Sequence, residues 1–237
     1  NRAPMAKCLF GAVRDTLMEL LSDPRYLGAQ PAFLAALHTW GRSLSLHPHL
    51  HVLIADGGLD QHGAWVKPRR SHFLPARVLM LVFRGKFLAA LRHALERHAL
   101  RLPPDLTRAR FVSLLNRLGR KKWNVHIRAR YAHGQGVAAY LARYLKGGPL
   151  KNSQLLPAAG ERVRFRYRPH RDEDDPSSDP VVMTLTSEAF LARYLALELG
   201  EGEKHVQRQS THGCRRVERL GHGDERDPAL VEALDDL

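Results

Sequence analysis

The chain has 237 residues, 44% hydrophobic and 26% charged, so it can bury a core and is not disordered over its length. Lysine and arginine outnumber aspartate and glutamate by 37 to 24, and the resulting net charge of +13 favours a polyanionic partner, nucleic acid before an anionic membrane surface. We expect neither a transmembrane helix nor a secretory signal peptide, and two cysteines are too few for a disulfide scaffold.

The N-terminal half is expected to mix helices and strands. Apolar residues at helical spacing predict helices over 8–22, 75–100 and 107–118, and residues 31–40 are expected to form a short helix or turn. A β-branched apolar run predicts a buried strand over 49–55 that ends in a turn at 56–58, with a short returning strand at 64–66.

The C-terminal half continues this irregular order. Alternation predicts strands over 122–130, 161–168 and 181–185, and helical spacing predicts helices over 137–147 and 187–199. Such an order, with hairpin-like pairs, favours an α+β fold over a doubly wound parallel sheet. We expect one domain over 1–220 and a flexible acidic tail over 221–237.

Two histidines on the strand at 49–55 form the sharpest local signal. Residues two apart on a strand point to the same face, so His49 and His51 project side by side while Leu50 points to the other face. Two such imidazoles make half of a divalent metal site, and the alternative is a pair of solvated histidines. His47 is a further candidate ligand, although Pro48 interrupts the regular strand.

Tyr140 and Tyr144 stand four residues apart on the helix expected over 137–147, so they share one face. An aromatic core pair is the simpler interpretation. Basic residues around the pair suggest instead a role with phosphate, because a phenol of pKa about 10 becomes a nucleophile only with assistance. A metal held by histidines can supply that assistance at a phosphodiester.

These motifs resemble a known family, the two-tyrosine transposases of bacterial insertion sequences, whose metal motif is histidine–hydrophobic–histidine. The metal motif corresponds to His49-Leu50-His51 and the paired-tyrosine motif to Tyr140 and Tyr144. Further segments of the resemblance, which covers roughly residues 5 to 215, are 37–41, 65–66, 83–87, 152–153, 165–168, 183–185 and 193–195.

The resemblance implies a central antiparallel sheet of four to five strands flanked by helices. It implies Mg²⁺ or Mn²⁺ bound by His49 and His51, and Tyr140 and Tyr144 as nucleophiles that nick and rejoin single-stranded DNA at transposon ends through 5′-phosphotyrosine links during rolling-circle transposition. It also implies action in the bacterial cytoplasm, with no membrane and no small-molecule cofactor. The third metal ligand is left open, and the candidates are His47, His126 and Asn152.

Basic residues near these motifs are candidates for contact with DNA phosphates. The strand over 161–168 carries arginine at every second position, opposite Phe165. The basic helix over 75–100 has either a solvated face or a DNA contact. The residues that we expect to bind DNA are Lys122, Arg128, Arg143, Lys146, Arg164 and Arg166.

Other functions stay open at this point. Members of the family usually carry a zinc-binding domain upstream, and this chain, which opens on Asn1, is expected to be a fragment or a truncated copy. A replication initiator or relaxase would use the same chemistry, and a decayed remnant would bind DNA without cutting it. A hydrolase with water as nucleophile would need a carboxylate near the histidines, for which Asp56 is the candidate.

Overall fold

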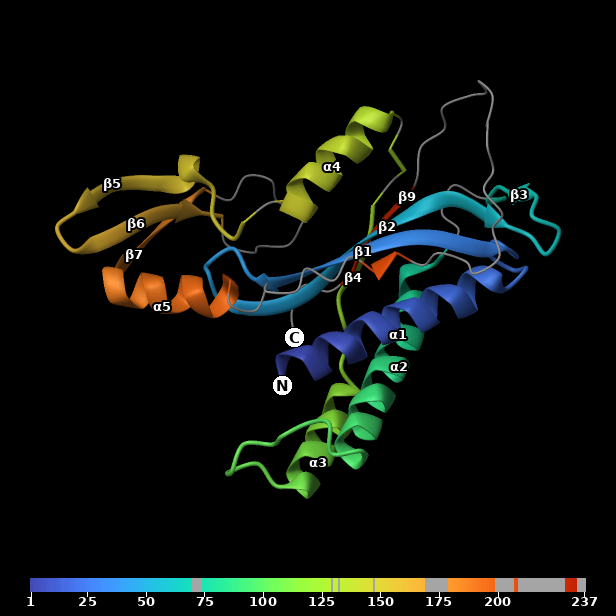
Figure 1. Ribbon diagram of the computed structural model, residues 1–237, viewed down its shortest axis with the longest axis horizontal. Coiled ribbons are helices and arrows are strands. Elements are labelled where there is room, and N and C mark those ends of the chain that lie inside the picture. The colour runs from blue at the N-terminus through green and yellow to red at the C-terminus, as the bar shows by residue number, and fades with distance from the viewer. Residues whose placement is uncertain are drawn as a thin grey trace. The chain divides into compact units, whose positions relative to one another are not determined.

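The structure, a computed structural model, describes residues 1–69, 74–128, 130–131, 133–146, 148–168, 179–198, 207–208 and 229–233. It confirms the α+β class (Figure 1). The chain divides into two compact units, the first made of residues 1–36, 50–138 and 206–237 and the second of residues 37–49 and 139–205.

One antiparallel sheet contains the strand with the paired histidines. Its hydrogen-bonded order is β4-β9-β2-β1-β8, and β3 pairs with the far end of β2. The strands are β1 (Gln30–Trp40), β2 (Leu46–Leu59), β3 (Trp65–Val66), β4 (Val125–Ile127), β8 (Gln207–Arg208) and β9 (Ala229–Ala233). The expected returning strand at 64–66 is therefore present, as β3.

Helices α1 (Arg2–Ser22) and α2 (Ala76–Glu96) provide the core of the first unit. They pack against each other and meet β2 and β4, where apolar side chains from all four elements come together, including Leu17, Val52 and Phe83. Val52 lies on the same side of β2 as Leu50. The helices therefore cover the apolar side of β2, and the histidines at 49 and 51 lie on the other side.

The second unit has a three-stranded antiparallel sheet and a helix that packs on it. The strands β5 (Leu155–Ala159), β6 (Arg162–Tyr167) and β7 (Val181–Thr186) lie in that order, and helix α5 (Ser187–Glu198) follows. Phe165 is fully buried with Leu44 and Leu197 at its centre, and the ring of Phe190 lies 6.3 Å from that of Phe165. The arginines of β6 point away from this core.

Helix α4 (Gly134–Lys146) precedes η1 (Asn152–Gln154), and helix α3 (Arg108–Leu118) follows α2. The helices expected over 8–22, 75–100, 107–118, 137–147 and 187–199 are all present as α1 to α5.

Three expectations about the elements are corrected. Residues 31–40 form strand β1 rather than a helix or turn, because pairing with β2 outweighs the helix propensity of an alanine-rich segment. Strand β2 does not end at 56–58 but continues through Gly57 and Gly58 to Leu59. Glycine fits at these two positions because neighbouring atoms lie too close for a side chain: a Cβ on Gly58 would lie 2.4 Å from the carbonyl oxygen of Gln30. The strand expected over 122–130 is limited to β4.

The turn after β2 lies instead at residues 60–64. The Asp60 carboxylate accepts hydrogen bonds from the backbone N–H groups of Ala64 and His62, both at 2.8 Å, and the first of these bonds does most to lower its pKa. Strands β5, β8 and β9 were not expected from the sequence. Strand β9 lies in the C-terminal stretch whose remainder is outside the described residues, and the domain boundary at residue 220 stays a prediction.

Candidate metal site and paired tyrosines

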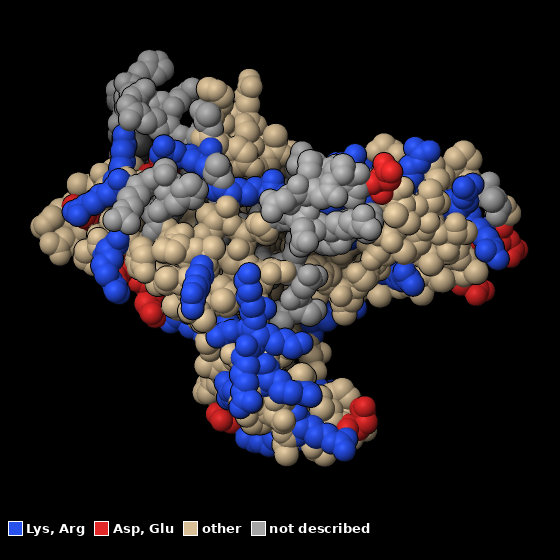
Figure 2. All heavy atoms as spheres, turned by 180° about the vertical axis from the view of Figure 1, so that it is seen from behind, with Lys and Arg blue, Asp and Glu red and all other residues tan. Residues whose placement is uncertain are grey.

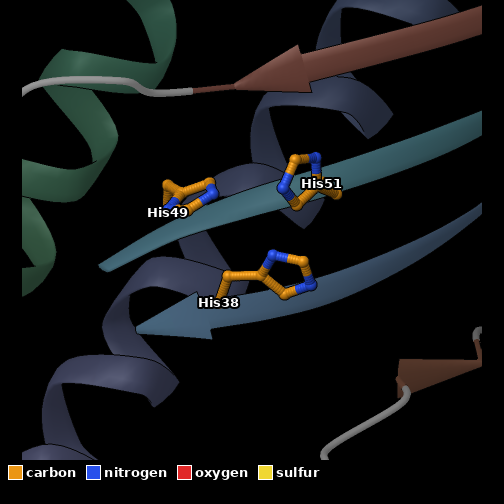
Figure 3. Close-up of side chains that lie close together, drawn as sticks. All are labelled: His38, His49 and His51. Atoms are coloured by element: carbon orange, nitrogen blue, oxygen red, sulfur yellow. The ribbon is translucent and has the colours of Figure 1, made fainter. Parts of the chain in front are cut away.

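A strand pair builds the candidate metal site. Strands β1 and β2 are neighbours in the sheet and are joined by a turn in which the N–H of Gly41 donates to the carbonyl oxygen of Ser45 at 2.9 Å. His38 comes from β1, and His49 and His51 come from β2; Figure 3 shows the three side chains close together on these strands.

The geometry of these three histidines suits a cation. One ring nitrogen from each lies within 4.8 Å of the others, and the residues are only 7%, 9% and 8% exposed. Three imidazoles held by two paired strands are already positioned before a metal binds, which lowers the cost of assembling the site. The residues present therefore fit a divalent cation.

The tautomer of His49 also suits a ligand. Its Nδ1 lies 2.9 Å from the carbonyl oxygen of His47. A carbonyl oxygen only accepts hydrogen bonds, so Nδ1 carries the proton and donates it. The lone pair of the neutral ring is then on Nε2. Metal-binding histidines commonly have this arrangement, because a backbone carbonyl that accepts the proton of one ring nitrogen leaves the other nitrogen free to bind the metal.

His38 is the residue that sequence reasoning missed. Its ring stacks on that of Trp40, with centroids 4.6 Å apart and an interplanar angle of 15°, and makes an edge contact with His49 at 5.4 Å. The expectation of a helix or turn over 31–40 hid this residue, because only a strand beside β2 brings position 38 next to the pair.

The third ligands considered from the sequence are not part of this cluster. His47 contributes its backbone carbonyl, and its ring lies 5.2 Å from that of His49. His126 lies in β4, and Asn152 is exposed in η1. Asp56, the carboxylate considered for a hydrolase, forms an ion pair with Arg130 at 2.5 Å. Within the described part of the chain, the histidine cluster includes no carboxylate.

Both tyrosines lie on α4, as expected, four residues apart. Tyr140 is 5% exposed and its hydroxyl oxygen is buried. The side chains of Arg143, Tyr144 and Lys146 lie outside what the structure describes.

The remaining basic residues expected to bind DNA fall in both units. Lys122 and Arg128 are exposed on either side of β4 in the first unit. Arg164 is half-buried and Arg166 exposed on β6 in the second unit. The structure brings together the three histidines; the joint use of histidines, tyrosines and these cations remains a proposal.

An antiparallel sheet bearing a histidine–hydrophobic–histidine strand, in a chain with two tyrosines one helical turn apart, defines the class of protein that the motifs indicated. A family model described as "Putative transposase" (Y2_Tnp) matches residues 32–215. The chain belongs to this transposase family, and the resemblance drawn from its motifs is confirmed.

Two relatives illustrate the similarity. The chain is 34% identical to "Putative transposase y4qJ" of Sinorhizobium fredii (strain NBRC 101917 / NGR234) over 224 residues. The aligned stretch covers 92% of this chain and 55% of the relative. It is 31% identical to the transposase for insertion sequence element IS801 of Pseudomonas savastanoi pv. phaseolicola over 169 residues. This aligned stretch covers 67% of the chain and 40% of the relative.

The chain thus spans about half the length of the curated relatives it matches. No solved structure matches it. None of the helices in the described ranges has the length and apolar character needed to cross a membrane.

Proposed function

We propose that this chain nicks and rejoins single-stranded DNA at the ends of an insertion sequence, through 5′-phosphotyrosine intermediates, during rolling-circle transposition. The observation that carries the proposal is the buried cluster of His38, His49 and His51 in a member of a transposase family. The paired tyrosines of α4 supply the second half of the chemistry.

The three histidines would hold the divalent metal. When bound, such an ion withdraws charge from the non-bridging oxygens of a phosphodiester and orients it for in-line attack. We expect Mn²⁺ to bind more tightly than Mg²⁺, because Mg²⁺ prefers oxygen ligands and releases its water reluctantly, whereas imidazole is a good ligand for transition ions.

The tyrosines would be the nucleophiles. A phenolic oxygen of Tyr140 or Tyr144 attacks phosphorus, the bond from phosphorus to the 3′ oxygen breaks, and the phenol loses its proton while the 3′ oxygen gains one. The new phosphotyrosine keeps the phosphodiester linkage, so the reverse reaction with another 3′-hydroxyl rejoins the strand without ATP. The hydroxyl of Tyr140 is buried in the free protein, so substrate binding has to uncover it.

Basic residues would hold the strand during this exchange. Successive arginines of β6 lie about 6.6 Å apart on one side of the strand, so Arg164 and Arg166 can follow a single DNA backbone. Lys122, Arg128, Arg143 and Lys146 complete the proposed contacts.

The direct test is a cleavage assay with labelled single strands that tile the DNA flanking the gene, incubated with Mn²⁺ and separated on a denaturing gel. We expect a covalent protein–DNA band that needs metal and is lost in the double variant Tyr140→Phe/Tyr144→Phe and in His49→Ala. Tyr26→Phe and His62→Ala are matched controls, because neither residue lies on α4 or in the histidine cluster. Cleavage that survives both tyrosine changes would contradict the proposal.

Metal binding has a readout that is independent of cleavage. Trp40 stacks on His38, so a paramagnetic ion at the cluster should quench its fluorescence. We expect Mn²⁺ to quench the wild type and to leave Trp40→Phe and His49→Ala unchanged. Equal quenching in His49→Ala would remove the cluster from the proposal.

The alternative is a decayed remnant that binds DNA without cutting it. In that case neither the wild type nor any variant would cleave DNA, and substituting the histidines would leave DNA binding unchanged. A replication initiator or relaxase would give the same covalent band, so the choice between them needs a transposition assay with a marked element. A water-using hydrolase is less well supported, because Asp56 is engaged by Arg130.

A further inference from the structure

Helix α3 carries a stripe of basic residues whose side chains make no ion pair with any residue that the structure describes. Arg110 and Arg117 stand seven residues apart on one side of the helix, and Arg120 follows its end in the same direction. The stripe runs for about 15 Å, at about 1.5 Å per residue, and continues into Lys121 and Lys122. All five residues are exposed.

The opposite side of α3 holds the helix in place. Leu115 is 1% exposed, and a Cβ on Gly119 would lie 3.3 Å from Leu88 of α2. Trp123, which is 3% exposed, donates from Nε1 to the carbonyl oxygen of Leu118 at 3.0 Å and packs on two phenylalanines of α2. The basic stripe therefore lies on a fixed backbone.

Three basic residues of α2, unlike those of the α3 stripe, have internal partners. Arg92 donates to Oδ1 of Asn116 at 2.9 Å, Arg84 donates to the carbonyl oxygen of Lys121, and Lys86 pairs with Glu19 at 2.7 Å. Arg84, Lys86 and Arg92 therefore support the fold, whereas the arginines of the α3 stripe are left for a partner.

The charge in the first turn of α3 works against helix stability, although Arg117 in the last turn is placed favourably. Arg108 and Arg110 lie in the first turn, where the helix dipole favours acidic residues, and that turn contains none. Between Asp60 and Glu161 the sequence contains only two acidic residues, Glu96 and Asp105. Figure 2 shows lysine and arginine gathered over the end formed by α2 and α3. A polyanion would remove this repulsion.

We infer that the outer side of α3 binds the sugar-phosphate backbone of double-stranded DNA without reading its sequence. A duplex presents one charge per about 1.7 Å of axis, so the stripe lies opposite several phosphates. Proteins that bind single strands add aromatic side chains on which bases stack. Here Trp123 is buried and Phe111 is half-buried, so the stripe offers charge but no stacking surface.

This surface goes beyond the proposed strand-cleaving site and rests on that proposal only for DNA as the partner. It would hold duplex DNA while a strand is cut. Its contribution is an electrostatic one, so it should fall steeply with salt concentration.

The test measures fluorescence anisotropy of a labelled 30-base-pair duplex of random sequence, with EDTA present so that cleavage plays no part. The variant is Arg110→Gln/Arg117→Gln/Arg120→Gln, since glutamine keeps helix propensity. We expect at least a tenfold weaker duplex affinity and a slope of log affinity against log salt that is smaller by roughly three. A single strand of the same length should bind the variant and the wild type alike.

The control is Arg14→Gln/Arg25→Gln/Lys67→Gln, which removes the same charge elsewhere, two of the three residues being paired with neighbouring aspartates. It should keep the wild-type affinity and slope. Equal duplex binding by the two triple variants, or a loss confined to the single strand, would overturn the inference. Duplex binding that depends on α3 in a protein that never forms the covalent band would instead overturn the proposed chemistry alone.

Discussion

Strand β6 and helix α3 both present a row of arginines, but they are anchored to the protein differently. Each places arginine on one side and apolar residues on the other, with the period of its own secondary structure. The apolar side of β6 centres on Phe165, which is 0% exposed and surrounded by side chains from α5 and the β1–β2 turn. The apolar side of α3 has one fully buried residue, Leu115.

The difference indicates how firmly each basic surface is held. The arginines of β6 are fixed by a packed core, so they suit a strand that must be positioned for chemistry. The arginines of α3 are fixed by Leu115 and a few polar contacts, so they suit a backbone that only has to be kept nearby. Substitutions on the apolar sides test this distinction first, because they have the largest effects.

Phe165→Ala should lower the free energy of unfolding by about 3–5 kcal/mol, because it removes a fully buried ring and leaves a cavity. Urea denaturation followed by circular dichroism measures this loss. Phe190→Ala, at a half-buried position in the same cluster, is the matched control and should cost less. A loss below about 1 kcal/mol for Phe165→Ala would mean that β6 is not held by this core.

Leu115→Ala should cost about 2–3 kcal/mol, and its effect should remain local. Few contacts attach α3 to α2, so we expect amide hydrogen exchange to accelerate over 108–118 while β6 keeps its protection. Mass spectrometry of peptic fragments reports both segments in one experiment. Equal acceleration in the two segments would show that α3 and β6 unfold together.

The hydrogen bond from Arg92 to Asn116 should contribute about 0.5–1 kcal/mol, since it is exposed. A double-mutant cycle with Arg92→Ala and Asn116→Ala isolates this energy. The same change should not alter duplex affinity beyond the effect of one lost charge. A coupling energy of zero would leave Leu115 and the Trp123 anchor as the contacts that hold α3.

The basic surface of β6 and half of the metal site could be predicted from the sequence, because they depend on local periodicity; the basic stripe of α3 was not predicted. Alternation around Phe165 placed the arginines of β6 on one side, and alternation in 49–51 placed two histidines together. The structure agrees with both patterns.

What the sequence left undetermined depends on pairing between distant segments. His38 joins the cluster only because β1 lies beside β2, and its segment has the composition of a helix. The internal partners of Arg92 and Lys86 were equally hidden, since a basic helix has the same pattern whether its cations bind DNA or neighbouring residues. Periodicity identifies the side of an element but not what covers it.

Single arginine substitutions should have the smallest effect on folding and the sharpest effect on partners. Arg166→Gln and Arg117→Gln each remove an exposed charge, so each should change the free energy of unfolding by less than about 0.5 kcal/mol. We expect Arg166→Gln to weaken binding of the single strand, and Arg117→Gln to weaken binding of the duplex and lower its salt slope by about one. Anisotropy with both probes on both variants gives four affinities. If both variants bind the same probe more weakly and to the same extent, β6 and α3 contact the same kind of DNA. The difference in how the two elements are packed would then have no counterpart in function.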